Sequence, residues 1–412
     1  MIAAALGAAL LPGAAIARGL DIGFADDVFT SPDAALRDTW LQHTTQVGAT
    51  IVRLNIGWPA ATRPARPADP ADPAYDWAPA DAAVDAARAR GLKVLLDFTG
   101  MPSWARTPGA PRGADPATWR PRAEPIGAYG HALAAHFKGR VSRFQVWNEP
   151  NLSKYLAPQW SKGRAAAPAI YRAMLNAFYA GVKRAQPKAI VVTAGTAPFG
   201  DFGHGKRMMP VIFWRSLLRR RARFDALSHH PYSVGGPTRH ALNSADVSIP
   251  DLGKHRRLLR AAHHPARLWV TEVSYDSSPP DPQGVPQASH ARWLEQTLEI
   301  LWRQGVDTVT WFLVRDQAPE PSYAATNQSG VFLRDGRAKL AATAFRFPFV
   351  VSRTGIWLRA PVAGLLKVTR DRTTVRRMRV RAGQVVQLRL RVRRGASYRA
   401  GVGGVDSLPW RG

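Results

Sequence analysis

Glutamate is scarce in this chain, and two of its glutamates stand where carboxylates could do chemistry. The sequence contains only six glutamates beside 23 aspartates, so glutamate is not a common filler residue here. Glu149 lies within the tripeptide Asn-Glu-Pro, residues 148–150, directly after the apolar run 143–147. Glu272 comes directly after the apolar run 267–271. If folding brings these two side chains together, one carboxylate can exchange a proton while the other acts as a nucleophile.

The composition limits which other chemistry is available. The 412 residues include no cysteine, which excludes a disulfide framework, a thiolate metal site and a cysteine nucleophile. There is no Walker A run, no HExxH motif and no glycine-rich turn after the first predicted strand, so we expect no cofactor. The adjacent pair His229 and His230 could suggest a metal, but no third ligand accompanies it at a recognisable spacing. We therefore expect no metal site.

The elements that must position the two glutamates alternate regularly along the chain. Short apolar runs predict eight strands, at residues 20–24, 50–56, 92–98, 143–147, 189–193, 224–228, 267–271 and 308–312. Amphipathic segments predict helices at residues 33–47, 78–90, 126–137, 167–185, 208–221, 251–262, 287–303 and 339–345. A helix after each strand indicates parallel strands. The pattern predicts an α/β fold, a (β/α)8 TIM barrel over residues 18–350.

In such a barrel both glutamates would face one cleft. Strands four and seven lie across the mouth from each other, and active sites are built at the carboxyl-terminal face, where the long loops of this chain also fall. Two carboxylates facing each other are what the hydrolysis of a glycosidic bond requires. The alternative is that each glutamate only pairs with one of the many arginines.

At these positions the sequence resembles clan A of the retaining (β/α)8 glycoside hydrolases, which includes families 5, 39, 51 and 79. The resemblance rests on Asn-Glu-Pro after strand four and the single glutamate after strand seven, and extends loosely over residues 20–350. Residues 101–105 (Met-Pro-Ser-Trp-Ala) resemble the Pro-x-Trp-Ala stretch of families 39 and 51, and residues 151–152 (Asn-Leu) resemble family 39, so the likeness is greatest to family 39. The third strand lacks the histidine that many family 5 members have there.

The resemblance implies a role for each matching residue. Glu149 would be the general acid and base, Glu272 the nucleophile, and Asn148 would bond the sugar 2-hydroxyl. Arg53 lies inside an apolar strand, where clan members have an arginine close to the nucleophile, and its charge would keep Glu272 ionised. In His229-His230-Pro231-Tyr232, which resembles the clan's His-x-Tyr, Tyr232 would donate a hydrogen bond to Glu272 and His230 would line the cleft.

Tryptophans near strand ends are candidate platforms for sugar rings. The candidates are Trp311 at the end of the eighth strand, Trp58, Trp104 and Trp147. Packing in the core is the alternative for each of them.

The amino terminus predicts export. Residues 1–17 form an apolar stretch that ends in Ala-Ile-Ala, the pattern of a signal-peptidase site, although it lacks a positively charged start. The expected location is secreted or cell-surface, and a buried first helix is the alternative. No other stretch approaches the length of a membrane span.

The carboxyl-terminal segment concentrates positive charge. The chain carries a net charge of +28, and only 10 of its 57 basic residues are lysine, a bias that genome composition could explain. Residues 353–412, however, hold fifteen basic residues against Asp371 and Asp406. Apolar residues alternate with arginine over 375–381 and 386–393, which predicts strands with one apolar and one arginine face in a small β-sandwich-like, all-β domain at 355–412.

The arginine face has two interpretations. It could be a solvated surface, or it could bind an anionic cell-wall polymer such as a teichoic acid or an acidic polysaccharide. Nucleic acid is not expected, because the segment lacks interleaved exposed aromatics.

The sequence as a whole favours an exported retaining glycosidase that acts on an oligo- or polysaccharide through a covalent glycosyl-enzyme. A barrel that binds a glycan or an anionic cell-wall polymer without cleaving it is the alternative.

Overall fold

The computed structural model describes residues 18–203 and 205–412, so the predicted signal peptide at 1–17 lies outside the described residues. Eight parallel strands close into a barrel in the order β1-β12-β9-β8-β7-β4-β3-β2. Their bounds are β1 Asp21–Ala25, β2 Ile51–Asn55, β3 Lys93–Phe98, β4 Arg143–Val146, β7 Ile190–Thr193, β8 Ala226–His229, β9 Arg267–Val270 and β12 Val306–Phe312. The predicted (β/α)8 fold and all eight predicted strands are confirmed.

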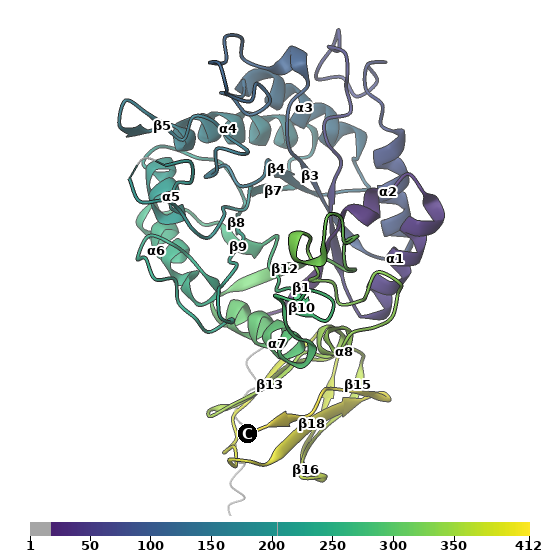
Figure 1. Cartoon of the computed structure of the whole chain (residues 1–412). Helices are drawn as coiled ribbons and strands as arrows, with labels where there is room; N and C mark the ends of the chain where they lie inside the picture. The colour runs from purple at the N-terminus through teal and green to yellow at the C-terminus, as the bar shows by residue number, and fades with distance from the viewer. Residues whose placement is uncertain (1–17, 204) are drawn as a thin grey trace, which may run out of the picture.

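Helices surround this barrel, as Figure 1 shows. They are α1 Ala34–Gln46, α2 Ala78–Ala89, α3 Ala123–His136, α4 Ala167–Ala185, α5 Pro210–Leu218, α6 Gly253–Ala261, α7 Gln287–Arg303 and α8 Leu340–Arg346. Each overlaps one predicted helix, and the ends differ by a few residues. The apolar faces of these helices bury one large core against the outer surface of the strands.

The barrel interior changes from apolar to polar toward the active-site end. Side chains two positions apart on a strand point to the same side, so each strand contributes successive layers to the interior. The lower layer is an apolar plug of Ile51, Leu95, Val192, Ala226 and Trp269. Two residues further along the same strands lie Arg53, Asp97, Thr271, Ser228 and, from β4, Gln145. The plug closes the barrel beneath a buried polar layer, on which the candidate site stands.

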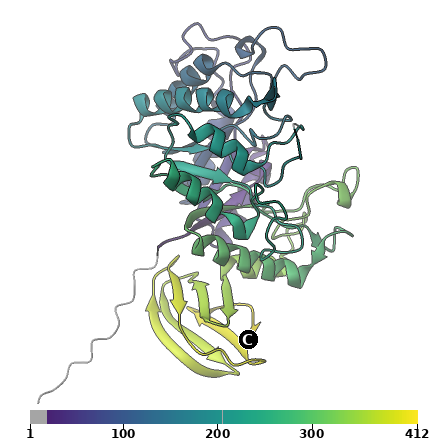
Figure 2. The same cartoon turned by 90° about the vertical axis from the view of Figure 1, so that its left-hand side faces the viewer.

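The carboxyl-terminal region forms two antiparallel sheets. One contains β13 Phe349–Ser352, β14 Gly355–Arg359 and β17 Val385–Leu388, and the other contains β15 Gly364–Arg370, β16 Thr373–Val380, β18 Ser397–Val402, β19 Val405–Asp406 and β20 Trp410–Arg411. A separate apolar cluster, including Phe349, Leu366 and Tyr398, is buried between them. These sheets lie beside α7 and α8 in both views (Figures 1 and 2).

Two details of this region differ from the prediction. The sheets begin at Phe349, within the segment assigned to the barrel. The alternation over 386–393 predicted one strand, but β17 ends at Leu388. Its partner β14 begins at Gly355 after a tight turn from β13, so the residues that follow Leu388 have no strand to pair with.

Within residues 18–203 and 205–412, no helix is both long enough and apolar enough to cross a bilayer.

Candidate active site

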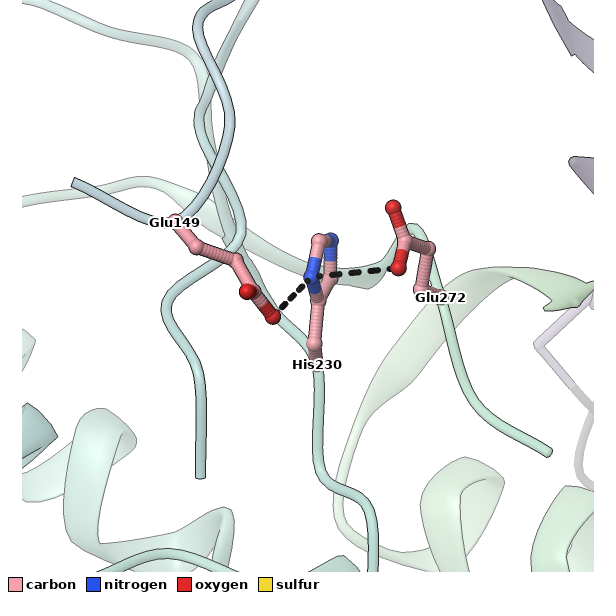
Figure 3. A group of neighbouring side chains, drawn as sticks. All are labelled: Glu149, His230 and Glu272. Atoms are coloured by element: carbon pink, nitrogen blue, oxygen red, sulfur yellow. Dashed lines mark hydrogen bonds and ion pairs between the residues drawn. The ribbon is translucent and has the colours of Figure 1, made fainter. Parts of the chain in front are cut away.

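The two predicted glutamates meet at the mouth of the barrel. Glu149 follows β4 and Glu272 follows β9, and they approach His230 from opposite sides (Figure 3). The Nδ1 atom of His230 lies 3.0 Å from Glu149 Oε1 and 3.6 Å from Glu272 Oε2. The side chains of Glu149 and Glu272 are 14% and 15% exposed, so both can reach a molecule in the cavity. The structure therefore brings the pair together, as the strand positions predicted.

The backbone that carries Glu149 adopts an unusual conformation. Trp147 has φ 75° and Glu149 has φ 32°, in the left-handed region that non-glycine residues seldom occupy. Hydrogen bonds hold the segment there: the Trp147 amide donates to Phe98 O and the Glu149 amide to Gly195 O, both at 3.0 Å. Such strain costs about 1–3 kcal/mol per residue and persists where the surroundings over-determine it, which is common at active sites.

Gly195 supports the site in a second way. A Cβ atom on this residue would lie 2.1 Å from His230 Nε2, so no larger residue fits while His230 keeps its position. The His230 ring also bonds Thr271 Oγ1 through Nε2 at 3.0 Å. Sequence reasoning missed Gly195, because its role depends on a ring 35 positions away along the chain.

Arg53 connects the buried polar layer to the nucleophile candidate. Its NH1 lies 2.5 Å from Glu272 Oε1 and its NH2 lies 2.6 Å from Asp97 Oδ2. The same NH2 donates to Asn148 Oδ1 at 3.2 Å, which orients the amide beside Glu149. The predicted proximity of Arg53 to Glu272 is present, while Asp97, the second carboxylate on this guanidinium, was not foreseen.

The surroundings of Glu272 favour its ionised form. Burial opposes ionisation, but the charges of His230 and Arg53 and the hydrogen bonds from Arg53 and Tyr232 outweigh it and lower the pKa of Glu272 below its ordinary value. Tyr232 donates from its hydroxyl to Glu272 Oε2 at 3.3 Å. Burial and the nearby carboxylates raise the pKa of Tyr232 well above its ordinary value, so it stays a neutral donor.

A cavity of about 250 Å³ opens above these groups. Its lining comes from several strand ends and includes Arg53, Asn148, Glu149, Glu272, Asn55, Thr99, Asp26 and Asp27. Burial raises the pKa of Asp26 to about 6, although it accepts hydrogen bonds from three backbone amides. Asp26 and Asn55 were missed by sequence reasoning, and the available signal was their position at strand ends, Asp26 directly after β1 and Asn55 as the last residue of β2.

The candidate tryptophan platforms take different places. Trp58 lines a second hollow of about 700 Å³, and Thr99 lines both hollows. Trp104 packs edge-on against Trp58, with ring centroids 5.5 Å apart. Trp311 is fully buried and donates from its indole to Ser329 O, so the structure corrects its predicted role: it packs in the core. Trp147 is likewise buried.

The two glutamates and His230 also form the kind of group that can bind a cation. One ligand atom from each side chain lies within 4.8 Å of the others. Arg53, however, places a fixed positive charge against Glu272 and opposes a second cation there. The charge of Arg53 favours the direct contacts of His230, a hydrogen bond with Glu149 and an ion pair with Glu272, over coordination of a metal.

Comparison with known proteins agrees with this architecture. No family model and no curated protein sequence matches the chain. Among solved structures, a family 39 glycoside hydrolase from the gut symbiont Bacteroides cellulosilyticus WH2 is similar, with 18% identity, a TM-score of 0.61, and coverage of 93% of this chain and 81% of that one. A GH39 β-xylosidase from Caulobacter crescentus has 18% identity and a TM-score of 0.58 over 92% of this chain and 95% of that one.

A glucosidase from Croceicoccus marinus is also similar, with 14% identity and a TM-score of 0.57 over 92% of this chain and 94% of that one. At these identities the likeness establishes the fold, and the fold implied by the clan A resemblance is thereby confirmed.

Proposed function

We propose that this protein is an exported retaining glycoside hydrolase in which Glu149 is the general acid and base and Glu272 is the nucleophile. The observation that carries this proposal is the placement of both carboxylates around His230, at the floor of one cavity, with Arg53 bound to only one of them. The asymmetry gives the two glutamates different partners. Glu272 accepts from a guanidinium and a phenol, whereas Glu149 bonds a histidine that can give or take a proton.

The spacing of the carboxylates supports the retaining mechanism. One oxygen of Glu149 lies within 4.8 Å of one oxygen of Glu272. Retaining enzymes hold their carboxyl groups about 5–5.5 Å apart, whereas inverting enzymes separate them by about 6.5–9.5 Å to admit a water molecule. The shorter spacing favours direct attack by Glu272.

In the first step, a carboxylate oxygen of Glu272 attacks the anomeric carbon as the bond from that carbon to the leaving oxygen breaks. Glu149 gives its proton to the leaving oxygen, so the aglycone departs as a neutral alcohol. Glu272 is thereby esterified and loses its negative charge.

In the second step, Glu149, now a carboxylate, removes a proton from water while the water oxygen attacks the anomeric carbon. Glu272 leaves as a carboxylate and the sugar retains its configuration. Arg53 and Tyr232 stabilise the carboxylate of Glu272 in the free enzyme, and the 2-hydroxyl of the sugar is assigned to Asn148 by the clan resemblance.

The shape of the site supports a substrate longer than one sugar. Thr99 lines both the cavity that contains the two glutamates and the hollow that Trp58 lines. A half-buried indole beside a polar cavity suits the apolar face of a sugar ring. An oligo- or polysaccharide that occupies both hollows is therefore the proposed substrate class.

Export is proposed from the sequence of residues 1–17 and from their small-residue ending. Mass spectrometry of the protein recovered from the culture medium tests it. A mature chain that begins at Arg18 is the expected result, and a full-length chain found only inside the cell would contradict it.

The function itself is tested with a panel of aryl glycosides: xyloside, glucoside, arabinofuranoside, mannoside, galactoside and glucuronide. Two of these correspond to the xylosidase and glucosidase named above. We expect release from at least one of them, reduced by roughly 10⁴-fold or more in Glu272→Ala because the nucleophile is absent. Glu124→Ala is the matched control, since Glu124 is another of the few glutamates but is 73% exposed on α3.

The same variant tests the mechanism. An external nucleophile such as azide can fill the space left in Glu272→Ala and restore bond cleavage with inversion at the anomeric carbon. Restored cleavage with an inverted azide adduct supports the retaining assignment. A wild-type product of inverted configuration, or equal loss in Glu124→Ala, would contradict it.

If the wild type binds glycans but hydrolyses neither the aryl glycosides nor polymeric glycans, the alternative of a non-catalytic glycan-binding barrel is favoured.

A further inference from the structure

The outer face of the sheet formed by β15, β16 and β18 carries a cluster of cations. Lys367 on β15 lies directly opposite Arg377 on β16, and the neighbouring pair joins Leu365 to Arg379. Arg399 on β18 lies opposite Thr369 on the same face. The side chains that alternate with these, such as Leu366 and Val368, are buried. We call Lys367, Arg377, Arg379 and Arg399 the cationic face.

The cationic face is neither buried nor neutralised by the protein. All four of its side chains are exposed, as are nine other basic residues of the carboxyl-terminal region: Arg353, Arg372, Arg376, Arg381, Arg389, Arg391, Arg393, Arg394 and Arg411. Among residues 18–203 and 205–412, no ion pair involves any residue from 353 onward. Elsewhere in the same residues some arginines are paired, as Arg207 is with Asp201, and others, such as Arg219 and Arg220, are in no ion pair. The carboxyl-terminal region differs because none of its basic residues is paired with a carboxylate of the described chain.

This arrangement works against the stability of the sheet. Like charges directly opposite each other on neighbouring strands are destabilising, and Lys367 and Arg377 form such a pair. β16 is also an edge strand, on which a single Glu in place of either residue would have given a favourable pair. The repulsive pair lowers the stability of the sheet, and an anion bound from outside would neutralise it. A stability cost of this kind is common where residues serve binding.

A groove of about 380 Å³ runs along the same face. Lys367 and Arg399 line it with Leu365 and Asp406, and the glycines at 401, 403 and 404 form part of its floor. Glycines leave the backbone open to close approach. The groove therefore combines basic side chains, one carboxylate that can accept hydrogen bonds, and glycine backbone that no side chain covers.

We propose that the cationic face and its groove bind an acidic polysaccharide, with Arg377, Arg379, Arg399 and Lys367 holding its carboxylates and Asp406 accepting from its hydroxyls. Guanidinium groups match carboxylates as bidentate donors. Asp406 would repel a continuous polyphosphate chain but suits a sugar hydroxyl. The proposal is independent of whether the barrel hydrolyses glycosides.

Two other polyanions fit the face less well. Single-stranded nucleic acid is normally held by bases stacked on exposed aromatic rings, and no aromatic residue is among those that line the groove. A lipid surface is normally met by an apolar side of the protein, and Leu365 is the one large hydrophobic residue of this face that is markedly exposed.

The test compares two full-length variants with the same change in net charge. One carries Lys367→Glu, Arg377→Glu and Arg379→Glu on the cationic face. The other carries Arg219→Glu, Arg220→Glu and Arg221→Glu, three exposed arginines that follow α5 on the barrel. Binding to polygalacturonate is measured at about 50 and 200 mM salt, with neutral dextran, single-stranded DNA and vesicles of equimolar phosphatidylcholine and phosphatidylglycerol as comparison ligands.

We expect the wild type to bind polygalacturonate and not dextran, with an affinity that falls roughly tenfold or more between the two salt concentrations. The cationic-face variant should lose about tenfold or more at low salt, and the α5 variant less than about twofold. Equal loss in both variants, no binding to polygalacturonate, or tighter binding to DNA or to the vesicles would overturn the proposal. Thermal unfolding of both variants shows that each remains folded.

Discussion

The cavity at the barrel mouth and the cationic face of the carboxyl-terminal sheet both depend on charge, but they use it in opposite ways. In the cavity, Arg53 is buried between Asp97 and Glu272 at 2.6 and 2.5 Å, so these three charges have fixed partners. On the sheet, Lys367 and Arg377 are exposed, adjacent and unpaired. Buried pairs fix one geometry and resist screening, whereas exposed charges act over a distance and weaken in salt.

The difference has a practical consequence. A change of one group in the cavity should alter chemistry by orders of magnitude and leave polymer binding intact. A change on the sheet should act gradually, through the sum of several charges. The size of the effect of a single substitution therefore distinguishes the two regions.

The largest of these effects is expected from Glu149→Gln. Loss of the proton donor should lower kcat/KM on a substrate with a poor leaving group by about 10²–10⁴-fold. An activated aryl leaving group needs little protonation, so its first step should suffer much less. Steady-state rates on a matched pair of substrates check this, with polygalacturonate binding measured on the same sample. An equal loss of kcat/KM on both substrates would contradict the assignment of Glu149 as the proton donor. A loss of polygalacturonate binding in the same variant would show that the two regions are not independent.

A smaller effect is expected from Tyr232→Phe. The variant removes one hydrogen bond to Glu272 Oε2, which should lower kcat/KM by roughly tenfold. That bond contributes to the lowered pKa of Glu272, so without it the pKa rises toward its ordinary value. Because the nucleophile must be ionised, activity is lost as pH falls through this pKa. The acidic limb of the pH profile should therefore move to higher pH.

The pH profile of kcat/KM for wild type and Tyr232→Phe provides the measurement. An acidic limb that stays in place while the maximum falls would show that Tyr232 contributes only to packing.

The smallest effect is expected from the single change Lys367→Glu. It turns a repulsive cross-strand neighbour of Arg377 into an attractive one, and should raise the free energy of unfolding by about 0.2–1 kcal/mol. Denaturant unfolding measures this, and adding salt should reduce the gain because both side chains are exposed. Hydrolysis by the variant should equal that of the wild type. A lower free energy of unfolding in the variant would show that repulsion between Lys367 and Arg377 does not destabilise the sheet.

The features that could be predicted are those with a local signal. The eight strands were found because each is a short apolar run bounded by polar loops. Glu149 and Glu272 were found because each lies within two residues of the end of such a run. Once the strands were counted, their positions across the barrel mouth followed from topology.

The features that were missed depend on contacts between distant segments. Gly195 matters because of the His230 ring, and Asp97 because it shares Arg53 with Glu272. Trp311 has the sequence position of a platform, but its indole turns to Ser329 O and is buried. The strand expected over 386–393 stops at Leu388, because its antiparallel partner β14 begins at Gly355 and extends no further in that direction.

The sequence by itself determined the barrel, the two strand ends that carry the glutamates and the concentration of arginine near the carboxyl terminus, because hydrophobic period and composition are properties of neighbouring residues. Only the tertiary structure decided that Arg53 is shared between Glu272 and Asp97, and that Lys367 and Arg377 lie side by side on an open sheet. The physical reason is that electrostatic energy depends on distance and burial in three dimensions, which spacing along the chain does not specify.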